Sequence, residues 1–238
     1  MARIAPLQHE QGKDFETVFD VVEAVMGFVP NSMRVMARDP DLFAAFAQLS
    51  AIVVVRPGRI DPGLKALIMY MVSRSAGCQY CVAHTANLAA SRGIPVRKVQ
   101  EVWQYETSQE FNDAERAALR FAEAAGKVPN AVSDTDFAEL RRHFDEDEII
   151  EMVAVIAFLG FLNRWNDTLA TPLEAAPQDF AERHLTNSGW TAGKHCGASV
   201  AAPPVRRAVP FKTRLFLWLL RRYGPRAHRA ESTVVGSR

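Results

Sequence analysis

Apolar residues recur three and four positions apart along most of this chain, a spacing that gathers them on one face of an α-helix. Residues 15–26 (FETVFDVVEAVM) and 114–126 (AERAALRFAEAAG) show the pattern most clearly. The run Val53–Val55 has strand-forming residues, but no second alternating segment offers a strand a partner. The spacing therefore predicts an all-α fold.

Capping residues and glycines predict where several helices begin and end. Asp61 is expected to cap a helix that continues to Gly77, and Asn112 is expected to cap another. Between these two, helices are predicted over residues 78–91 and over residues 97–106.

The longest predicted helix follows the acidic run Asp145–Glu148, whose carboxylates suit the positive end of a helix dipole. It continues through residues 149–165 (IIEMVAVIAFLGFLNRW), which are apolar on all sides in the middle. We therefore expect this helix to lie at the centre of the fold.

The character of the sequence changes near Gly189. Residues 1–188 are predicted to form one helical domain, and residues 189–238 an arm rich in Gly, Ala and Pro with a basic amphipathic tail. In residues 205–230, Lys and Arg occur without Asp or Glu around the apolar run LFLWLL. Such a tail suits weak contact with an anionic membrane surface, or docking on a neighbouring subunit.

Charge and cysteine content exclude several classes of protein. The net charge of +1 gives no reason to expect nucleic-acid binding. The N-terminus lacks the apolar region of a secretory signal, and the apolar run 152–162 is too short to span a bilayer. Three cysteines do not make an extracellular disulfide framework, so a cytoplasmic location is expected.

The stretch GCQYCVAHT, residues 77–85, holds two of the three cysteines and one of the six histidines. If a helix begins near Gly77, both thiols lie in its first turn, where free N–H groups and the dipole favour a thiolate. At about 100° per residue, Cys81 lies about 60° from Cys78 and about 60° from His84 on the other side. Cys81 thus sits between a thiol that can form a disulfide with it and an imidazole that can accept its proton, as peroxide reduction requires.

Two other interpretations of these residues stay open. Structural Zn²⁺ takes four protein ligands, of which Cys78, Cys81 and His84 supply three, and His195 and Cys196 could complete the set. Alternatively, the small cysteines pack where two helices cross.

The helix dipole alone favours Cys78 as the more acidic thiol, because it lies nearer to the start of the helix.

The segment LKALIMYMVSRSAGCQYCVAHTANLAASRG (64–93) resembles the core of the carboxymuconolactone decarboxylase/alkyl hydroperoxidase D family. Residues 163–174 (NRWNDTLATPLE) and 189–195 (GWTAGKH) are similar to the peroxidase-related branch of that family. The resemblance covers about residues 15–195. It implies an alkyl hydroperoxidase D-like helical domain that forms homo-oligomers, commonly trimers or hexamers.

The resemblance also implies roles for the two thiols. In the hydroperoxidase members the second cysteine of the motif attacks the peroxide and the first resolves the product, which correspond here to Cys81 and Cys78. The geometry beside His84 agrees with this assignment. The lactone decarboxylation that names the family needs no cysteine pair, so the motif argues against that reaction here.

At two positions the chain departs from the hydroperoxidase pattern. The usual histidine position is Thr85 here, and the imidazole stands one place earlier, at His84. The proton-relay glutamate of the family corresponds to Ala66, which cannot carry a proton. A carboxylate from elsewhere must replace it for full activity, and Asp167 is the candidate.

Together these observations predict a thiol-dependent hydroperoxide reductase that uses Cys78, Cys81 and His84. Its expected partners are a small hydroperoxide, a separate thiol reductant and further copies of the chain, and no organic cofactor or metal is expected. One alternative is a redox-sensing or interaction protein of the same fold, which the alanine at position 66 favours. Another is a zinc-binding module.

Overall fold

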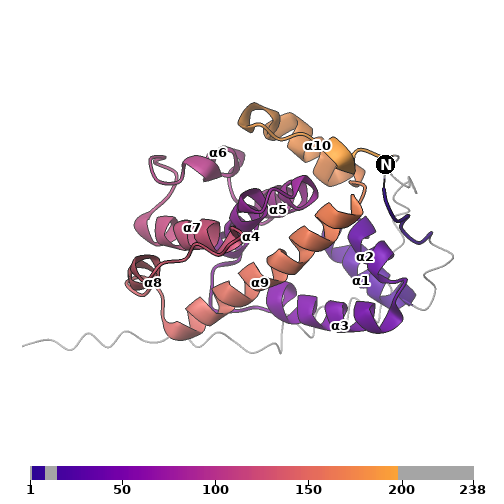
Figure 1. Ribbon diagram of the computed structural model, residues 1–238, viewed down its shortest axis with the longest axis horizontal. Helices are drawn as coiled ribbons and strands as arrows, with labels where there is room; N and C mark the ends of the chain where they lie inside the picture. The colour runs from indigo at the N-terminus through magenta and orange to yellow at the C-terminus, as the bar shows by residue number, and fades with distance from the viewer. Residues whose placement is uncertain (1, 9–14, 198–238) are drawn as a thin grey trace, which may run out of the picture.

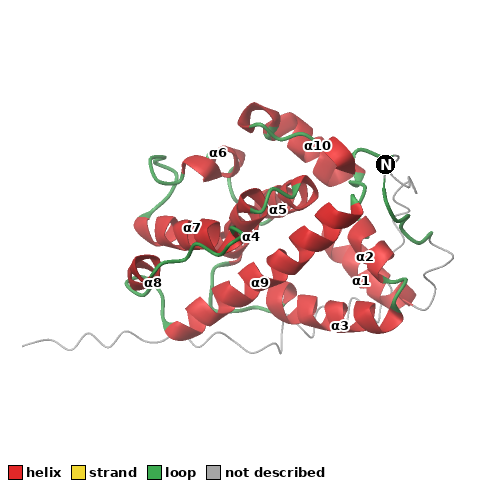
Figure 2. Ribbon diagram, in the orientation of Figure 1, coloured by secondary structure: helices red, strands yellow, loops and turns green. Residues whose placement is uncertain are grey.

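The computed structural model describes residues 2–8 and 15–197, and all regular secondary structure in that part of the chain is helical (Figures 1 and 2), which confirms the predicted fold class. Its α-helices are α1 (Glu16–Met26), α2 (Asn31–Met36), α3 (Pro40–Ser50), α4 (Pro62–Ser75), α5 (Gln79–Ser91), α6 (Val96–Gln100), α7 (Asp113–Gly126), α8 (Asp134–Leu140), α9 (Glu146–Leu169) and α10 (Ala175–His184).

Helix α4 lies at the centre of the molecule. Every residue from Gly63 to Ser73 is buried, and α4 packs against α5, α7 and α9. Helix α9 crosses the molecule diagonally, with α1–α3 on one side of it and α4–α8 on the other (Figure 1). Helix α10 then returns across α5. This arrangement places the start of α5 between α4, α9 and the C-terminal part of the described chain.

The predicted capping residues mark the helix starts. Asp61 Oδ1 accepts hydrogen bonds from the backbone N–H groups of Gly63 and Leu64 at 2.8 and 3.0 Å. Asn112 and Asp145 each form a reciprocal capping box with the glutamate three residues later. The positions of these starts could be predicted because a cap depends on neighbouring residues alone.

Two expectations about helices need correction. The helix expected over residues 97–106 is divided, since α6 ends at Gln100 and a separate 3₁₀ turn covers Val102–Gln104. The helix expected at the centre of the fold, α9, is uncovered along one side: Ile150, Val153 and Phe161 are 69%, 40% and 41% exposed. Their spacing puts them on one helical face, which the fold leaves uncovered in the single chain.

Residues 189–197, the first part of the predicted arm, pack on the helices. Trp190 is buried, and its indole N–H donates to the carbonyl of Gln79 at 3.0 Å. A 3₁₀ turn over Gly193–His195 buries His195. The remainder of the arm and the basic tail lie outside the described residues. Among the helices that are described, none combines the length and the apolar character needed to cross a bilayer.

Candidate active site

Cys78 and Cys81 lie together at the start of α5. Gly77, with a φ of 76°, turns the chain out of α4. Cys78 then occupies the N-cap position, where its Sγ accepts a hydrogen bond from the backbone N–H of Cys81 at 3.4 Å. Both side chains are buried and both thiols are free. The two thiols are therefore close in space and shielded from bulk solvent.

The surroundings of Cys81 shift the pKa of its thiol in opposite directions. Burial raises its pKa well above the usual value, and the adjacent Cys78 raises that pKa further. The side chain of Asn166, on α9, lowers it, because Asn166 Nδ2 donates toward Cys81 Sγ over 3.5 Å. Burial prevails, so Cys81 is protonated at neutral pH and needs a proton acceptor in order to react.

His84, the third predicted site residue, belongs to a network around Glu174. Its Nε2 lies 2.5 Å from Glu174 Oε2, and its ring stacks on Tyr80 with centroids 4.3 Å apart. Glu174 Oε1 accepts hydrogen bonds from the Tyr80 hydroxyl at 2.9 Å and from the backbone N–H of Asn31. Within residues 2–8 and 15–197, no hydrogen bond joins His84 to either thiol. The structure thus pairs the thiols and holds His84 on a carboxylate.

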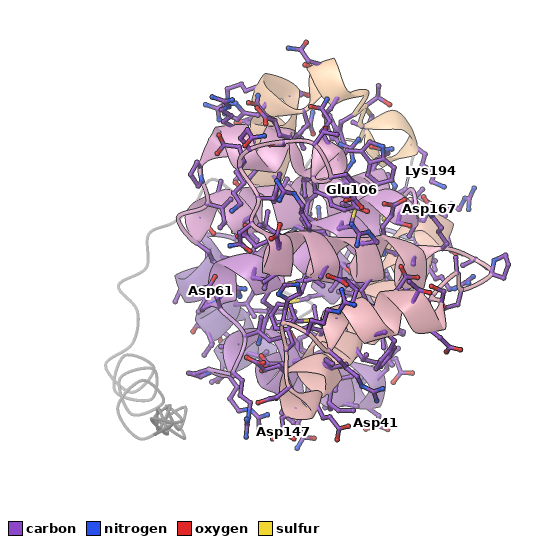
Figure 3. All side chains as sticks on the ribbon, turned by 90° about the vertical axis from the view of Figure 1, so that its left-hand side faces the viewer. Asp41, Asp61, Glu106, Asp147, Asp167 and Lys194 are labelled. Carbon is purple, nitrogen blue, oxygen red and sulfur yellow. The ribbon has the colours of Figure 1, made fainter. Side chains whose placement is uncertain are left out.

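The carboxylate that supports His84 is Glu174, whereas the sequence had pointed to Asp167. Glu174 is the residue before the first turn of α10, and it is buried. Asp167 lies on α9 and forms an ion pair of 2.7 Å with Lys194 (both labelled in Figure 3). The acid that Ala66 cannot supply is therefore present beside the imidazole, but it comes from a different position.

Thr85, at the histidine position of the resembled family, does not face the sulfur. Its hydroxyl donates to the backbone carbonyl of Cys81 at 2.6 Å, a bond within one turn of α5. Ala66 is completely buried in α4. Both residues serve the packing of the helices.

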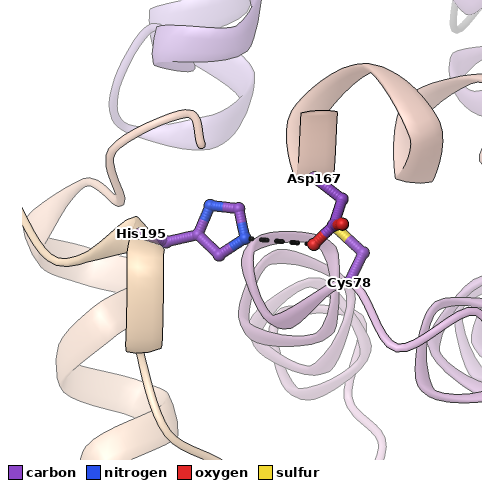
Figure 4. Close-up of side chains that lie close together, drawn as sticks. All are labelled: Cys78, Asp167 and His195. Carbon is purple, nitrogen blue, oxygen red and sulfur yellow. Dashed lines mark ion pairs between the residues drawn. The ribbon is translucent and has the colours of Figure 1, made fainter. Parts of the chain in front are cut away.

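A further polar cluster lies beside Cys78 (Figure 4). The Sγ of Cys78, a carboxylate oxygen of Asp167 and a ring nitrogen of His195 are all within 4.8 Å of one another. Thiol, carboxylate and imidazole are common metal ligands, and two of the zinc ligands considered from the sequence, Cys78 and His195, are among them. However, Lys194 already neutralises the carboxylate and its ammonium repels a divalent cation. The cluster thus brings a thiol, a carboxylate and an imidazole together beside a lysine ammonium.

A groove of about 650 Å³ runs between the ends of α4 and α7 and one face of α9. It reaches Ala76, just before the thiol pair, and Asp167 lies on its wall. Asn163 also lines it, and the buried side-chain amide of Asn163 has no hydrogen-bond partner among the described residues. An unpaired amide of this kind can bind a polar group of a substrate.

Sequence reasoning did not assign site roles to Asn166 and Glu174, and it considered His195 only as a zinc ligand. Asn166 and Glu174 both lie in NRWNDTLATPLE, the segment that resembles the peroxidase-related branch of the family. That resemblance does not show which residues the two side chains contact. Asn166 is separated from Cys81 by 85 positions in the chain, so only the packing of α9 against α5 brings them together.

The chain is similar to several known proteins. Residues 40–124 match the model of the carboxymuconolactone decarboxylase family. The chain is 28% identical over 148 residues to the uncharacterized protein YnjA of Escherichia coli (strain K12), and the match covers 62% of this chain and 81% of YnjA.

Solved structures give a wider match. The debrominase Bmp8, crystallised as a cysteine-to-alanine variant in complex with 2,3,4-tribromopyrrole, is 36% identical with a TM-score of 0.71, covering 76% of this chain and 96% of Bmp8. An uncharacterized peroxidase-related protein with an alkylhydroperoxidase AhpD core from Ralstonia eutropha JMP134 has a TM-score of 0.66 at 24% identity, covering 76% of this chain and 95% of that chain. The second match shows that the fold is shared.

Proposed function

This chain belongs to the carboxymuconolactone decarboxylase family, with an alkylhydroperoxidase AhpD-like fold, and we propose that it is a thiol-dependent hydroperoxide reductase working through Cys78 and Cys81. The observation that carries the proposal is the buried pair of free thiols at the start of α5, with the Cys81 backbone N–H 3.4 Å from Cys78 Sγ.

The two thiols divide the reaction between them. The Cys81 thiolate attacks the hydroperoxide, the O–O bond breaks, and the alcohol leaves after taking up a proton, so that Cys81 becomes a sulfenic acid. Cys78 then attacks that sulfur, which forms the disulfide and releases water. A separate thiol reductant of the cytoplasm reopens the disulfide.

His84 is the proposed base for Cys81. It follows Cys81 by one turn of α5, and Glu174 orients its ring and stabilises the imidazolium that forms when it accepts a proton. This carboxylate takes the role of the family glutamate that Ala66 replaces. Removing a general base commonly slows a reaction by at least about 100-fold, so His84→Asn should show a loss of that order.

The direct test is the consumption of cumene hydroperoxide with dithiothreitol as reductant. Cys81→Ser should abolish it, and Cys78→Ser should leave one turnover without recycling. Cys196→Ser is the matched control, because Cys196 is exposed whereas Cys78 and Cys81 are buried, and its loss should leave the rate unchanged. A rate that survives in Cys81→Ser would overturn the proposal.

A second candidate function is reductive dehalogenation, and the match to the debrominase Bmp8 over nearly its whole length favours it. The same thiol pair can supply the two electrons: Cys81 takes the halogen from carbon, the carbon takes a proton, and Cys78 displaces halide to form the disulfide. Bromide release from 2,3,4-tribromopyrrole, measured beside hydroperoxide consumption on the same preparation, decides between the two. Dehalogenation is excluded as the main activity if only the hydroperoxide is consumed.

The chain is also proposed to form homo-oligomers, as the family resemblance implies. The uncovered apolar face of α9, which includes Ile150, Val153 and Phe161, supports this proposal. Weak contact of the basic tail with an anionic membrane surface stays a prediction for residues outside the described part.

A further inference from the structure

The His195 ring is held in one tautomer by its surroundings. His195 is 1% exposed, and its Nδ1 lies 2.8 Å from the backbone carbonyl oxygen of Thr171. A carbonyl oxygen only accepts hydrogen bonds, so Nδ1 carries the proton. The other ring nitrogen, Nε2, is then left with a free lone pair.

That lone pair has no hydrogen-bond partner within the described residues, although it is buried. The nearest acidic oxygen is Asp167 Oδ1, at 3.7 Å from Nε2. A ring nitrogen of His195, the Asp167 carboxylate and the Cys78 sulfur form one group within 4.8 Å (Figure 4). A buried acceptor without a donor thus lies next to the Cys78 thiol.

We propose that His195 is the base that deprotonates Cys78 when Cys78 resolves the oxidised Cys81. This inference rests on the proposed thiol chemistry and adds a residue to it. The proton moves from Cys78 Sγ to His195 Nε2, and the thiolate attacks the sulfur of the Cys81 sulfenic acid. The S–S bond forms, the S–O bond breaks, and the leaving hydroxide takes the proton from the imidazolium as water.

The charges around the ring suit this role. Burial lowers the pKa of His195, and Lys194 lowers it further, whereas the Thr171 carbonyl and Asp167 raise it. The net effect is a lowered pKa, so the ring is neutral and able to accept a proton at neutral pH. After the transfer, the Asp167 carboxylate faces the imidazolium. Tyr80 is a further titratable group beside the ring, with the two ring centroids 5.9 Å apart. Burial raises the pKa of its hydroxyl well above the usual value, so it stays neutral.

The two imidazoles then serve different thiols. His84 is engaged with Glu174 and is the proposed base for Cys81. His195 comes from the segment after α10 and faces Cys78. Each thiol of the pair therefore has a base of its own, which allows attack and resolution to be tuned separately.

The test measures the reactivity of Cys78 alone, in the full chain carrying Cys81→Ser and Cys196→Ser. The rate of alkylation by iodoacetamide is followed from pH 6 to pH 10. Adding His195→Asn keeps a donor for the Thr171 carbonyl but removes the base, so the midpoint of the profile should rise by about one pH unit and the rate at neutral pH should fall about tenfold. His143→Asn, on the loop between α8 and α9, is the matched control and should change neither value.

A second variant keeps the proposal testable if His195→Asn fails to fold. Asp167 is 43% exposed, so Asp167→Asn should be tolerated. A carboxylate that merely lies beside a thiol disfavours the thiolate, and its removal would speed alkylation. If instead Asp167 stabilises the His195 imidazolium, its removal slows alkylation, which is the result expected here.

Unchanged profiles in both variants, or faster alkylation in Asp167→Asn, would overturn the role of His195. The assay needs no peroxide and no turnover. A protein that consumes no hydroperoxide can therefore still show the effect, and failure of the proposed function is distinguished from failure of this inference.

Discussion

Cys81 is the residue on which the proposed chemistry depends, and its surroundings favour the protonated thiol. Burial raises the pKa of the thiol, and the amide of Asn166 offsets only part of that effect. The helix dipole at the start of α5 favours the thiolate but does not outweigh the loss of water around a buried sulfur. The reactivity of Cys81 should therefore rise with pH, with a midpoint above that of an ordinary cysteine.

The contribution of Asn166 can be measured in the full chain carrying Cys78→Ser and Cys196→Ser. Asn166→Leu removes the hydrogen bond to Cys81 Sγ, and a bond to a charged group contributes about 1.5–3 kcal/mol, so alkylation at neutral pH should slow at least about tenfold. Thr85→Val is the control, because the Thr85 hydroxyl contacts only backbone carbonyls. Equal pH profiles for Asn166→Leu and its parent would contradict this account of the thiol.

Glu174 has a structural role beside its role on His84. Glu174→Ala leaves the Tyr80 hydroxyl and the backbone N–H of Asn31 without their acceptor, so the free energy of unfolding should fall by about 3 kcal/mol. Tyr80→Phe removes one of these bonds to Glu174 and the long bond of 3.3 Å that the hydroxyl accepts from the Ser32 backbone N–H, and we expect a loss of about 1 kcal/mol. Urea denaturation followed by circular dichroism measures both, and a smaller loss in Glu174→Ala than in Tyr80→Phe would show that the network is wrongly described.

At the scale of elements, the start of α5 depends on Gly77. Its φ of 76° is in the left-handed region, where a side chain is strained although no atom would obstruct it. Gly77→Ala should therefore lower the free energy of unfolding by about 1 kcal/mol. Gly160, inside α9, also has open space around it, and Gly160→Ala should raise that free energy by about 0.5–1 kcal/mol. Changes of the same sign in the two variants would contradict this explanation.

The starts of helices were predictable and their interruptions were not. Asp61, Asn112 and Asp145 cap helices through bonds to residues two or three positions away, so the sequence contains the whole signal. The break after Gln100 carries no glycine or proline. The exposed face of α9 could not be predicted either. An apolar helix surface has the same sequence pattern whether another helix of the chain or a second subunit covers it.

At the scale of the whole molecule, that face is the expected contact between subunits. Ile150→Glu combined with Val153→Glu places charges on it and should lower the mass of the assembly, measured by light scattering of the full chain. Val128→Glu is the control, because Val128 is 75% exposed but lies in the turn after α7. An unchanged mass in the double variant, or a single chain in the parent, would contradict this interface.

The arrangement of the whole molecule also explains which parts of the site could be predicted from the sequence. Cys78, Cys81 and His84 lie within one short stretch, so their spacing was visible as chemistry. The partners of this stretch, Glu174 and His195, come from beyond α9 and depend on how that helix crosses α5. No local pattern distinguishes Glu174 from Asp167 as the acid on His84.

The central claim is that the two buried thiols react with a hydroperoxide as a pair. The most direct measurement is a thiol titration of reduced Cys196→Ser protein before and after one equivalent of cumene hydroperoxide, followed by peptide mapping. We predict that both remaining thiols disappear together and that Cys78 and Cys81 are recovered as one disulfide, which dithiothreitol reverses. Two thiols that still titrate after the treatment, or an oxidised Cys81 without a bond to Cys78, would contradict the account.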